Sequence, residues 1–206
     1  MSKKGLFITF EGIDGSGKST QLDLLCGLFK SKNINFIKTR DPGGTDLGLQ
    51  LREILLHYKG KMAPLCELYL YLADRAQHVE EKLLPELENG TIVLCDRYLD
   101  STLAYQGYAR GLDKQKILEL NAFASQSLMP DLTLIFDIRA DEAAKRLGEA
   151  KDRLESEKTD FHRKVRDGYL ELAKQSPQRI KVLNAEEKPE KIHTKTVEII
   201  RQYVDF

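Results

Sequence analysis

The sequence lacks the features of a secreted or membrane-bound protein. Its three cysteines, Cys26, Cys66 and Cys95, are widely spaced and form no C-x-x-C pair, which argues against a disulfide framework or a structural zinc site and for a reducing compartment. The first apolar run, residues 6–10, has only five residues, too few for the core of a signal peptide or for a membrane span. We therefore expect a cytoplasmic protein without a membrane partner.

The sequence also lacks an excess of either charge, because 32 Lys and Arg residues balance 32 Asp and Glu residues. A balanced charge gives no indication of a nucleic acid or a membrane surface as the main partner. The chain has no internal repeat, low-complexity tract or Ser/Gly-rich linker, and its 206 residues suffice to bury a full core. These properties predict one domain over residues 1–206.

Short strand-type runs alternate with longer amphipathic segments, which is the pattern of an α/β protein with a parallel sheet and helices on both faces. The strand-type runs are residues 6–10, 35–39, 91–95, 132–137 and 179–183. In such sheets ligands bind beyond the carboxyl ends of the strands. We therefore expect the chemically informative residues directly after these runs.

Residues 12–19, GIDGSGKS, follow the first run and fit the phosphate-binding pattern G-x-x-x-x-G-K-[ST] between a strand and a helix. Glycines at this spacing let backbone N–H groups turn around an anion at a helix N-terminus. Lys18 is then expected to reach the β- and γ-phosphates of a nucleoside triphosphate, and the Ser19 hydroxyl to bind Mg²⁺. A glycine-rich turn without a ligand is the weaker alternative, since a strand and a helix flank the motif.

The segment RDPGG, residues 40–44, follows the second run. Proline and glycine explain the turn by themselves, whereas Arg40 offers planar, bidentate donors to a second anionic group. Arg52 lies in an amphipathic helical segment, residues 48–56. Its position alone favours the protein surface, and a contact with the same anion is the alternative.

A helical segment without glycine or proline, residues 65–84, places Tyr71, Arg75 and His78 on one face. A tyrosine ring beside an arginine offers a planar heterocycle a stacking surface and a donor for its edge. Considered in isolation, however, the helix favours Tyr71 as a core residue. His78 is expected at the helix surface or as a cap rather than as a catalytic base.

Asp96 and Arg97 follow the third run. A carboxylate at a strand end beside a phosphate loop can order the water around Mg²⁺, and the adjacent arginine can contact a phosphate. If the next residues are helical, Thr102, Tyr105 and Gln106 lie at i, i+3 and i+4 and present a hydroxyl, a ring and an amide to one site. These three side chains are suited to reading a base edge and a sugar.

Charged residues crowd together in residues 148–167. Such a run is typical of a solvated helix face. It is equally typical of a mobile cover whose basic residues close on phosphates. The composition leaves both interpretations open.

Together these motifs resemble the bacterial thymidylate kinases, a family of P-loop nucleoside monophosphate kinases, over nearly the whole chain. The resemblance rests on FEG (residues 10–12) before the phosphate loop, TRDPGG (39–44), ADR (73–75), DRY (96–98), AYQG (104–107) and PDLT (130–133). It implies a P-loop kinase fold with a five-stranded parallel sheet and a short mobile lid. It also implies a homodimer that uses Mg²⁺ and transfers the γ-phosphoryl group of ATP to dTMP, giving dTDP for dTTP synthesis.

The resemblance further implies a role for each matching residue. Thymine is expected to stack on Tyr71 and to hydrogen-bond to Arg75, Thr102 and Gln106, with Tyr105 against the sugar. The acceptor phosphate is expected between Arg40, Arg52 and Arg97, with Asp14 near the acceptor sugar and phosphate. Mg²⁺ is assigned to Ser19 and Asp96. ATP is assigned to Gly12, Ile13, Asp14, Gly15, Ser16, Gly17, Lys18, Ser19, Thr20 and Arg146.

Two positions depart from the pattern of some or many family members. Gly15 stands where some members carry a catalytic arginine, and Arg153 matches an arginine in the lid of members that lack it. The resemblance therefore implies that Lys18, Arg97 and Arg153 are catalytic, the last supplied by a lid at about residues 148–160. Asp41 replaces the glutamate that is common in its motif, a shorter carboxylate that we expect to be tolerated.

Rival functions demand residues of other kinds. A phosphorylated acceptor is already ionised, so no general base is expected, and positioning and charge stabilisation carry the catalysis. A deoxynucleoside kinase would instead need a carboxylate base for a neutral 5′-hydroxyl, and a GTP-binding switch an [NT]-K-x-D motif, which is not visible. A catalytically inactive nucleotide-binding protein would not need Lys18, Ser19, Asp96 and Arg97 together.

Overall fold

The computed structural model describes residues 5–148 and 152–206, and at its centre lies a five-stranded sheet in which neighbouring strands are all parallel. The strands are β1 (Phe7–Glu11), β2 (Phe36–Arg40), β3 (Ile92–Asp96), β4 (Leu132–Asp137) and β5 (Ile180–Asn184). Their order is β2-β3-β1-β4-β5, with Phe10 opposite both Asp96 and Leu134. The predicted α/β class with a five-stranded parallel sheet is confirmed.

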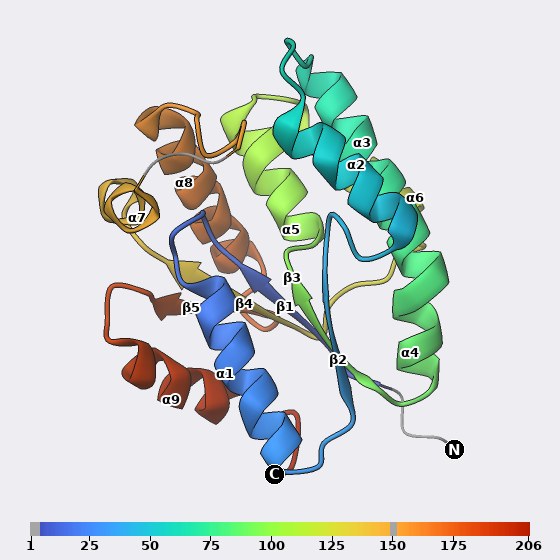
Figure 1. Cartoon of the computed structure of the whole chain (residues 1–206), viewed down its shortest axis with the longest axis vertical. Helices are drawn as coiled ribbons and strands as arrows, with labels where there is room; N and C mark the ends of the chain where they lie inside the picture. The colour runs from blue at the N-terminus through green and yellow to red at the C-terminus, as the bar shows by residue number, and fades with distance from the viewer. Residues whose placement is uncertain (1–4, 149–151) are drawn as a thin grey trace.

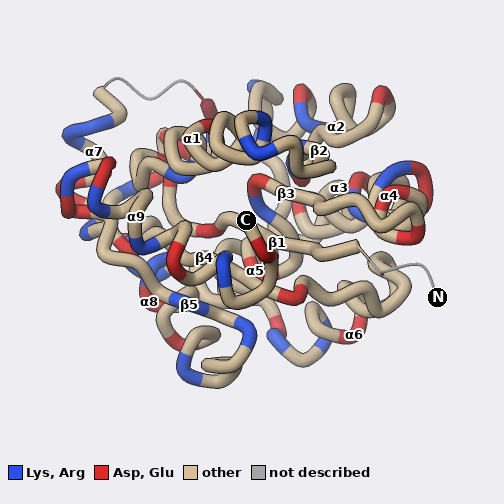
Figure 2. The backbone as a smooth tube through the Cα atoms, turned by 90° about the horizontal axis from the view of Figure 1, so that it is seen from below, with Lys and Arg blue, Asp and Glu red and all other residues tan. Residues whose placement is uncertain are grey.

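Helices connect the strands and cover the sheet (Figure 1). They are α1 (Lys18–Ser31), α2 (Asp46–His57), α3 (Pro64–His78), α4 (Leu84–Glu88), α5 (Leu99–Thr102), α6 (Lys114–Ala124), α7 (Ala140–Leu147), α8 (Thr159–Gln175) and α9 (Pro189–Ile200). π-Helical turns at Val79–Leu83 and Leu103–Ala109 prolong α3 and α5. Helix α1 lies on one side of the strands, and α6 and α8 lie on the other (Figure 2).

Alternate side chains of the central strands enter two different cores, as the period of a strand requires. Ile8 and Leu94 belong to one buried cluster with Leu22 of α1. Phe7 and Val93 belong to a second cluster with residues of α4 and of the π-helical turn before it. Burial on both faces explains why the sequences of these central strands are mostly apolar.

Four strands end one residue later than the apolar runs predict. Strands β1, β2, β3 and β5 end at Glu11, Arg40, Asp96 and Asn184. The apolar character stops before these residues, but the backbone pairing continues, and Arg40 still lies opposite Asp96 in the β2–β3 register. Polar residues expected in loops are therefore held on the rigid ends of strands.

Charges of both signs are spread over the molecule, with Lys and Arg alternating with Asp and Glu along the chain (Figure 2). The described helix α8 has 17 residues and carries charged residues along its length. None of the helices in residues 5–148 and 152–206 combines the length and the apolar composition that a bilayer crossing requires.

Candidate active site

The loop between β1 and α1 has a backbone shape that its glycines allow. Gly12, Gly15 and Gly17 have φ angles of 138°, 80° and 85°, which other residues rarely adopt. A Cβ on Gly12 would lie 2.7 Å from the carbonyl oxygen of Phe136 in β4. Helix α1 begins directly after the loop at Lys18, so the positive end of the helix dipole is at the loop, as an anion site requires.

The loop lines an open cleft together with residues of α7 and α9. Most of the predicted ATP-binding residues line it, namely Asp14, Gly15, Ser16, Gly17, Lys18, Ser19, Thr20 and Arg146. Gly12 and Ile13 lie outside this lining. Ile13 is buried, and its carbonyl oxygen accepts a hydrogen bond of 3.1 Å from Lys18 Nζ, so Ile13 holds the Lys18 side chain rather than lining the cleft.

Asp14 interacts with two cationic side chains beside the loop, those of Arg97 and Lys18. Its Oδ1 accepts a hydrogen bond of 2.6 Å from Arg97 and lies 3.8 Å from Lys18 Nζ. Burial opposes ionisation of Asp14, but the charges of Arg97 and Lys18 outweigh it and hold the pKa of Asp14 well below its usual value. Burial and the charge of Arg97 lower the pKa of Lys18. The structure thus brings these three predicted residues together.

Glu11 supports the turn that carries Arg97, and sequence reasoning missed it. Arg97 has a φ of 69°, and the N–H of the following residue, Tyr98, donates to Glu11 Oε1 at 2.8 Å. Ser101 donates to Glu11 Oε2 at 2.6 Å and accepts from Arg97 at 3.3 Å. Burial and the charge of Asp100 raise the pKa of Glu11 to about 7. A glutamate closing an otherwise uncharged strand is the only sign of this role in the sequence.

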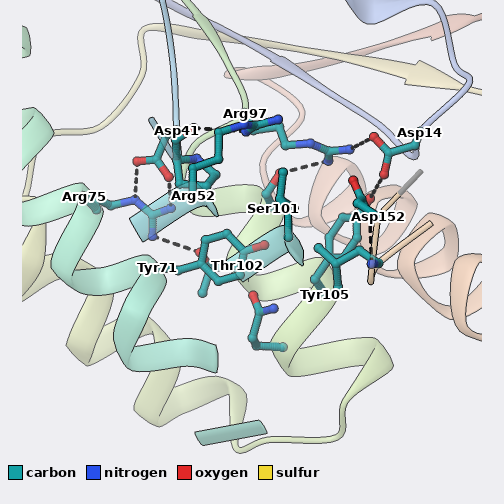
Figure 3. Close-up of a pocket in the computed structure, with 14 residues that line it drawn as sticks. Asp14, Asp41, Arg52, Tyr71, Arg75, Arg97, Ser101, Thr102, Tyr105 and Asp152 are labelled. Atoms are coloured by element: carbon teal, nitrogen blue, oxygen red, sulfur yellow. Dashed lines mark hydrogen bonds and ion pairs between the residues drawn. The ribbon is translucent and has the colours of Figure 1, made fainter. Parts of the chain in front are cut away.

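A second cavity shares Asp14 with the cleft. Figure 3 shows Arg97 reaching Asp14 at one end and Arg75 reaching Asp41 at the other. The lining consists of Asp14, Asp41, Pro42, Arg52, Leu56, Tyr71, Arg75, Arg97, Ser101, Thr102, Tyr105, Gln106, Asp152 and Leu154. It therefore includes every predicted acceptor-binding residue except Arg40.

Arg40 lies outside the lining but close to Arg52. A Cβ on Gly43 would lie 2.9 Å from Arg52 Cδ and 3.6 Å from Arg40 Cδ. Arg52 is half-buried rather than on the open surface, and it donates to the Pro42 carbonyl oxygen at 3.1 Å. Burial and the charges of Arg40 and Arg97 lower the pKa of Arg52. The charges of Arg40 and Arg97 therefore repel that of Arg52, so the three arginines predicted for one phosphate are electrostatically coupled.

Arg75 is fully buried, and hydrogen bonds use most of its donors. Nε and Nη2 donate to the two oxygens of Asp41 at 3.1 and 2.8 Å. Nη1 donates to Thr102 Oγ1 at 2.9 Å and to Asn121 Oδ1 at 2.5 Å. A guanidinium has five N–H donors, and these bonds use four, so one N–H is left for a ligand.

Tyr71, Tyr105 and Gln106 complete the cavity. Tyr71 is partly buried: it packs against the core and also lines the cavity, so it is not a core residue alone. Gln106 Nε2 donates to Glu67 Oε1 at 2.8 Å, and the Tyr105 hydroxyl donates to Asp14 at 3.4 Å. The three residues predicted to face one site, Thr102, Tyr105 and Gln106, all line this cavity. Residues 103–109, which carry two of them, form a π-helical turn.

His78 is neither a surface residue nor a cap. It is fully buried, and its Nε2 lies 2.8 Å from Thr39 Oγ1. Side-chain atoms of Asp41, Asp74 and His78 lie within 4.8 Å of one another, a spacing that could hold a cation, but both Asp41 oxygens already bind a guanidinium. Burial and the charge of Asp41 raise the pKa of Asp74 to about 7. Asp74 accepts from the Gly43 N–H at 2.9 Å, so this cluster holds the RDPGG turn.

The predicted lid, about residues 148–160, is described at residue 148 and from residue 152 onward, and residues 149–151 lie outside the described residues. Asp152 and Leu154 line the second cavity. Arg153 Nη1 lies 2.5 Å from Glu67 Oε2, and Arg153 Nε donates to the Leu55 carbonyl at 3.0 Å. The structure therefore places Arg153 beside Glu67 and not in the lining of the phosphate-loop cleft.

The two residues predicted for Mg²⁺ fit a hydrated cation. Ser19 lines the phosphate-loop cleft. Asp96 Oδ1 is buried and has no hydrogen-bond partner among the described residues, and the charge of Asp96 acts on Lys18. A hydroxyl and a carboxylate oxygen beside a phosphate site are the hard donors that Mg²⁺ prefers.

A parallel sheet with a phosphate loop between β1 and α1, and a second cavity across Asp14, defines a P-loop kinase. Residues 10–196 match the family model described as thymidylate kinase. Because this match covers most of the chain, the protein belongs to the thymidylate kinase family.

Individual relatives agree with the family match. The chain is 44% identical to thymidylate kinase of Thermoanaerobacter sp. (strain X514), over 98% of this chain and all of the relative. It is 49% identical to thymidylate kinase of Clavibacter michiganensis subsp. michiganensis, over 91% of this chain and 90% of the relative. The crystal structure of thymidylate kinase from Ehrlichia chaffeensis superposes with a TM-score of 0.79 at 35% identity, covering 96% of this chain and 99% of that one.

Proposed function

We propose that the protein transfers the γ-phosphoryl group of ATP to dTMP, giving ADP and dTDP for dTTP synthesis. Membership in the thymidylate kinase family makes the protein a nucleoside monophosphate kinase. The observation that carries the proposal for this chain is that Asp14 belongs both to the phosphate-loop cleft and to the second cavity. Two phosphorylated ligands, one in each, would meet at Asp14 and its two cations.

The donor nucleotide binds in the cleft. Its phosphates follow residues 12–20, with Lys18 at the β- and γ-phosphates, and its adenine lies against Arg146 of α7. The position of Arg146 in the same lining as the loop supports this assignment. A hydrated Mg²⁺ held by Ser19 and Asp96 neutralises charge on the phosphates when bound.

The hydrogen-bonding groups at the far end of the cavity match thymine. Gln106 gives its NH₂ group to Glu67, so its oxygen is left for the thymine N3–H. Arg75 keeps one N–H, and Thr102, whose oxygen accepts from Arg75, keeps its hydroxyl proton; both suit the O4 acceptor of thymine. Cytosine presents the reverse pattern, an acceptor at N3 and a donor at C4. Tyr71 stacks on the base.

The acceptor phosphate binds between Arg40, Arg52 and Arg97, with Tyr105 against the sugar and Asp14 near both. No general base is needed, because the acceptor is already an anion, and catalysis consists of alignment and charge neutralisation. Lys18 and Arg97 supply charge from fixed positions. Arg153 supplies the third positive charge. Because Arg153 is paired with Glu67 in the structure, it must leave Glu67 to bind a phosphate.

The protein forms a homodimer through helices α2, α3 and α6. These helices pack side by side, with α3 between α2 and α6 (Figure 1). They carry exposed apolar side chains, namely Leu47, Leu49, Ile54, Leu65, Tyr69, Leu118 and Phe123. Exposed apolar side chains on neighbouring helices support an interface there, and light scattering on the purified chain tests it. We further propose a single domain, residues 1–206, that works in the cytoplasm.

A nucleoside monophosphate panel tests the function. With ATP and Mg²⁺, ADP formation should be fastest with dTMP and should require the monophosphate. Phosphorylation of thymidine without turnover of dTMP would indicate a nucleoside kinase and overturn the proposal. Binding of ATP and dTMP without any ADP formation would indicate an inactive nucleotide-binding protein.

A further inference from the structure

Glu67 on α3 is a buried carboxylate to which the proposed reaction assigns no contact with either ligand. It lies one helical turn before Tyr71 and is only 1% exposed. Its Oε1 accepts from Gln106 Nε2 at 2.8 Å and from Arg110 Nε at 3.2 Å, and its Oε2 accepts from Arg110 Nη2 at 3.2 Å. Arg153 Nη1 lies 2.5 Å from the same Oε2. Groups from two separate parts of the chain, residues 106–110 and the predicted lid, thus meet on one side chain.

These partners keep Glu67 ionised. Burial opposes ionisation, but the hydrogen bonds from Arg110 and Gln106 and the arginine charges outweigh it and hold the pKa of Glu67 below its usual value. An ionised carboxylate can only accept hydrogen bonds. Gln106 must therefore turn its NH₂ group toward Glu67. Its amide oxygen then accepts no hydrogen bond from the described residues, and the side chain lines the acceptor cavity.

We propose that Glu67 is a positioning residue that determines base specificity, by fixing the Gln106 amide with its oxygen toward the base. The proposal rests on the proposed function, in which Gln106 reads the pyrimidine edge. With this orientation the site accepts a base that carries a proton on N3, as thymine does. A reversed amide would direct its NH₂ group at that N3–H, leaving two donors face to face, and would instead suit the unprotonated N3 of cytosine.

The Glu67→Gln variant removes the constraint because a glutamine at 67 can donate as well as accept, so the Gln106 amide can bind it in either orientation. A buried donor or acceptor left unpaired changes an equilibrium by roughly 10- to 100-fold. We expect the ratio of kcat/KM for dTMP to that for dCMP to fall by about this factor in Glu67→Gln, mainly through a higher KM for dTMP.

Two further variants separate positioning from general support of the fold. Arg110→Met removes another partner of Glu67 but leaves the carboxylate in place, so the dTMP-to-dCMP ratio should stay at the wild-type value. The exchange Glu67→Gln with Gln106→Glu keeps the charge and restores an acceptor on the base side, so it should restore the preference for dTMP. A structural role alone would not predict this rescue.

The measurements are kcat/KM for dTMP and dCMP, the Kd of each nucleotide by calorimetry, and a thermal unfolding curve for every variant. A folded Glu67→Gln protein with the wild-type ratio would overturn the proposal. If Glu67→Gln does not fold, the exchanged variant decides, and a loss of dTMP preference in it would overturn the proposal equally. Failure of the wild-type protein to phosphorylate dTMP would overturn the proposed function itself and is seen before any variant is made.

Discussion

Replacing Gly15 by alanine is expected to push the phosphate loop and helix α7 apart. Gly15 has a φ of 80°, and a Cβ built on it would lie 2.5 Å from the carbonyl oxygen of Ala143 and 3.1 Å from its carbonyl carbon. Both are backbone atoms of α7, so neither can rotate away as the end of a side chain would. Relief requires a shift of the loop or of the helix.

Two effects add in this variant. A residue other than glycine costs about 1–2 kcal/mol in the left-handed region, and an extra methyl group in a filled space costs about 1–3 kcal/mol. Gly15→Ala should therefore lose roughly 2–5 kcal/mol of unfolding free energy. Gly111→Ala is the matched control, because Gly111 also has a φ of 80° but no atom within 4 Å of the added Cβ. It should lose only about 1–2 kcal/mol.

Urea unfolding of the ligand-free variants measures the loss of unfolding free energy in each. Steady-state kinetics then shows which of the two ligand sites the shift of the loop affects. Arg146 of α7 lines the phosphate-loop cleft with Gly15, whereas no residue in the described lining of the acceptor cavity comes from α7. KM for ATP should therefore rise in Gly15→Ala while KM for dTMP stays near the wild-type value. Equal losses of stability in the two alanine variants, or a rise in KM for dTMP alone, would refute the reasoning.

Three further predictions concern charged groups. Lys18→Ala should lower kcat by about 10²-fold or more, because it removes a preorganised charge at the transferring phosphoryl group; a change confined to KM would contradict this. Arg153→Ala should lower kcat to a similar extent, and near-normal turnover would exclude its catalytic role. Asp74→Asn tests a pH dependence. Because the pKa of Asp74 is raised in the folded protein, protonation of Asp74 favours folding. This contribution is complete below pH 3.8 and is lost as the pH rises to about 7, and it amounts to at most about 4 kcal/mol. Asparagine has no such proton, so the difference in unfolding free energy between the two proteins should change between about pH 4 and 7, and a constant difference would contradict the assignment.

The central strands β1, β3 and β4 could be predicted from sequence because they are buried on both faces and therefore read as short, mostly apolar runs closed by an acidic residue. Their order could not. β2 pairs with β3 and not with β1, and β1 lies in the middle between β3 and β4. This order depends on how the connecting helices pack over the sheet, and nothing within a single run records it.

Site residues whose chemistry follows from their position after a strand were also predictable. Arg97 and Asp96 could be placed in this way, and Arg97 lines the acceptor cavity in the structure. Residues that act by holding others could not be predicted, since their contacts are distant in the sequence. Glu11 accepts from Tyr169, 158 residues away, and Glu67 binds an arginine in the predicted lid.

The direction of a polar side chain on a helix was the other source of error. His78 has the spacing of a surface or capping residue, yet the end of β2 covers it, and its ring is buried against Thr39. Tertiary packing, rather than the local pattern, decides which way this side chain faces.

The arginines of the site fall into two groups by their partners, and this decides what each can bind. Arg97 and Arg75 donate to carboxylates of the site and are oriented before a ligand arrives. Arg40 and Arg52 make no ion pair within the described part of the chain, and burial together with the neighbouring arginine charges lowers the pKa of Arg52. An anion beside Arg52 relieves that repulsion, whereas an anion beside Arg75 would have to displace a bound carboxylate. We therefore expect the acceptor phosphate to gain most at Arg40 and Arg52, and the uncharged base to bind at Arg75.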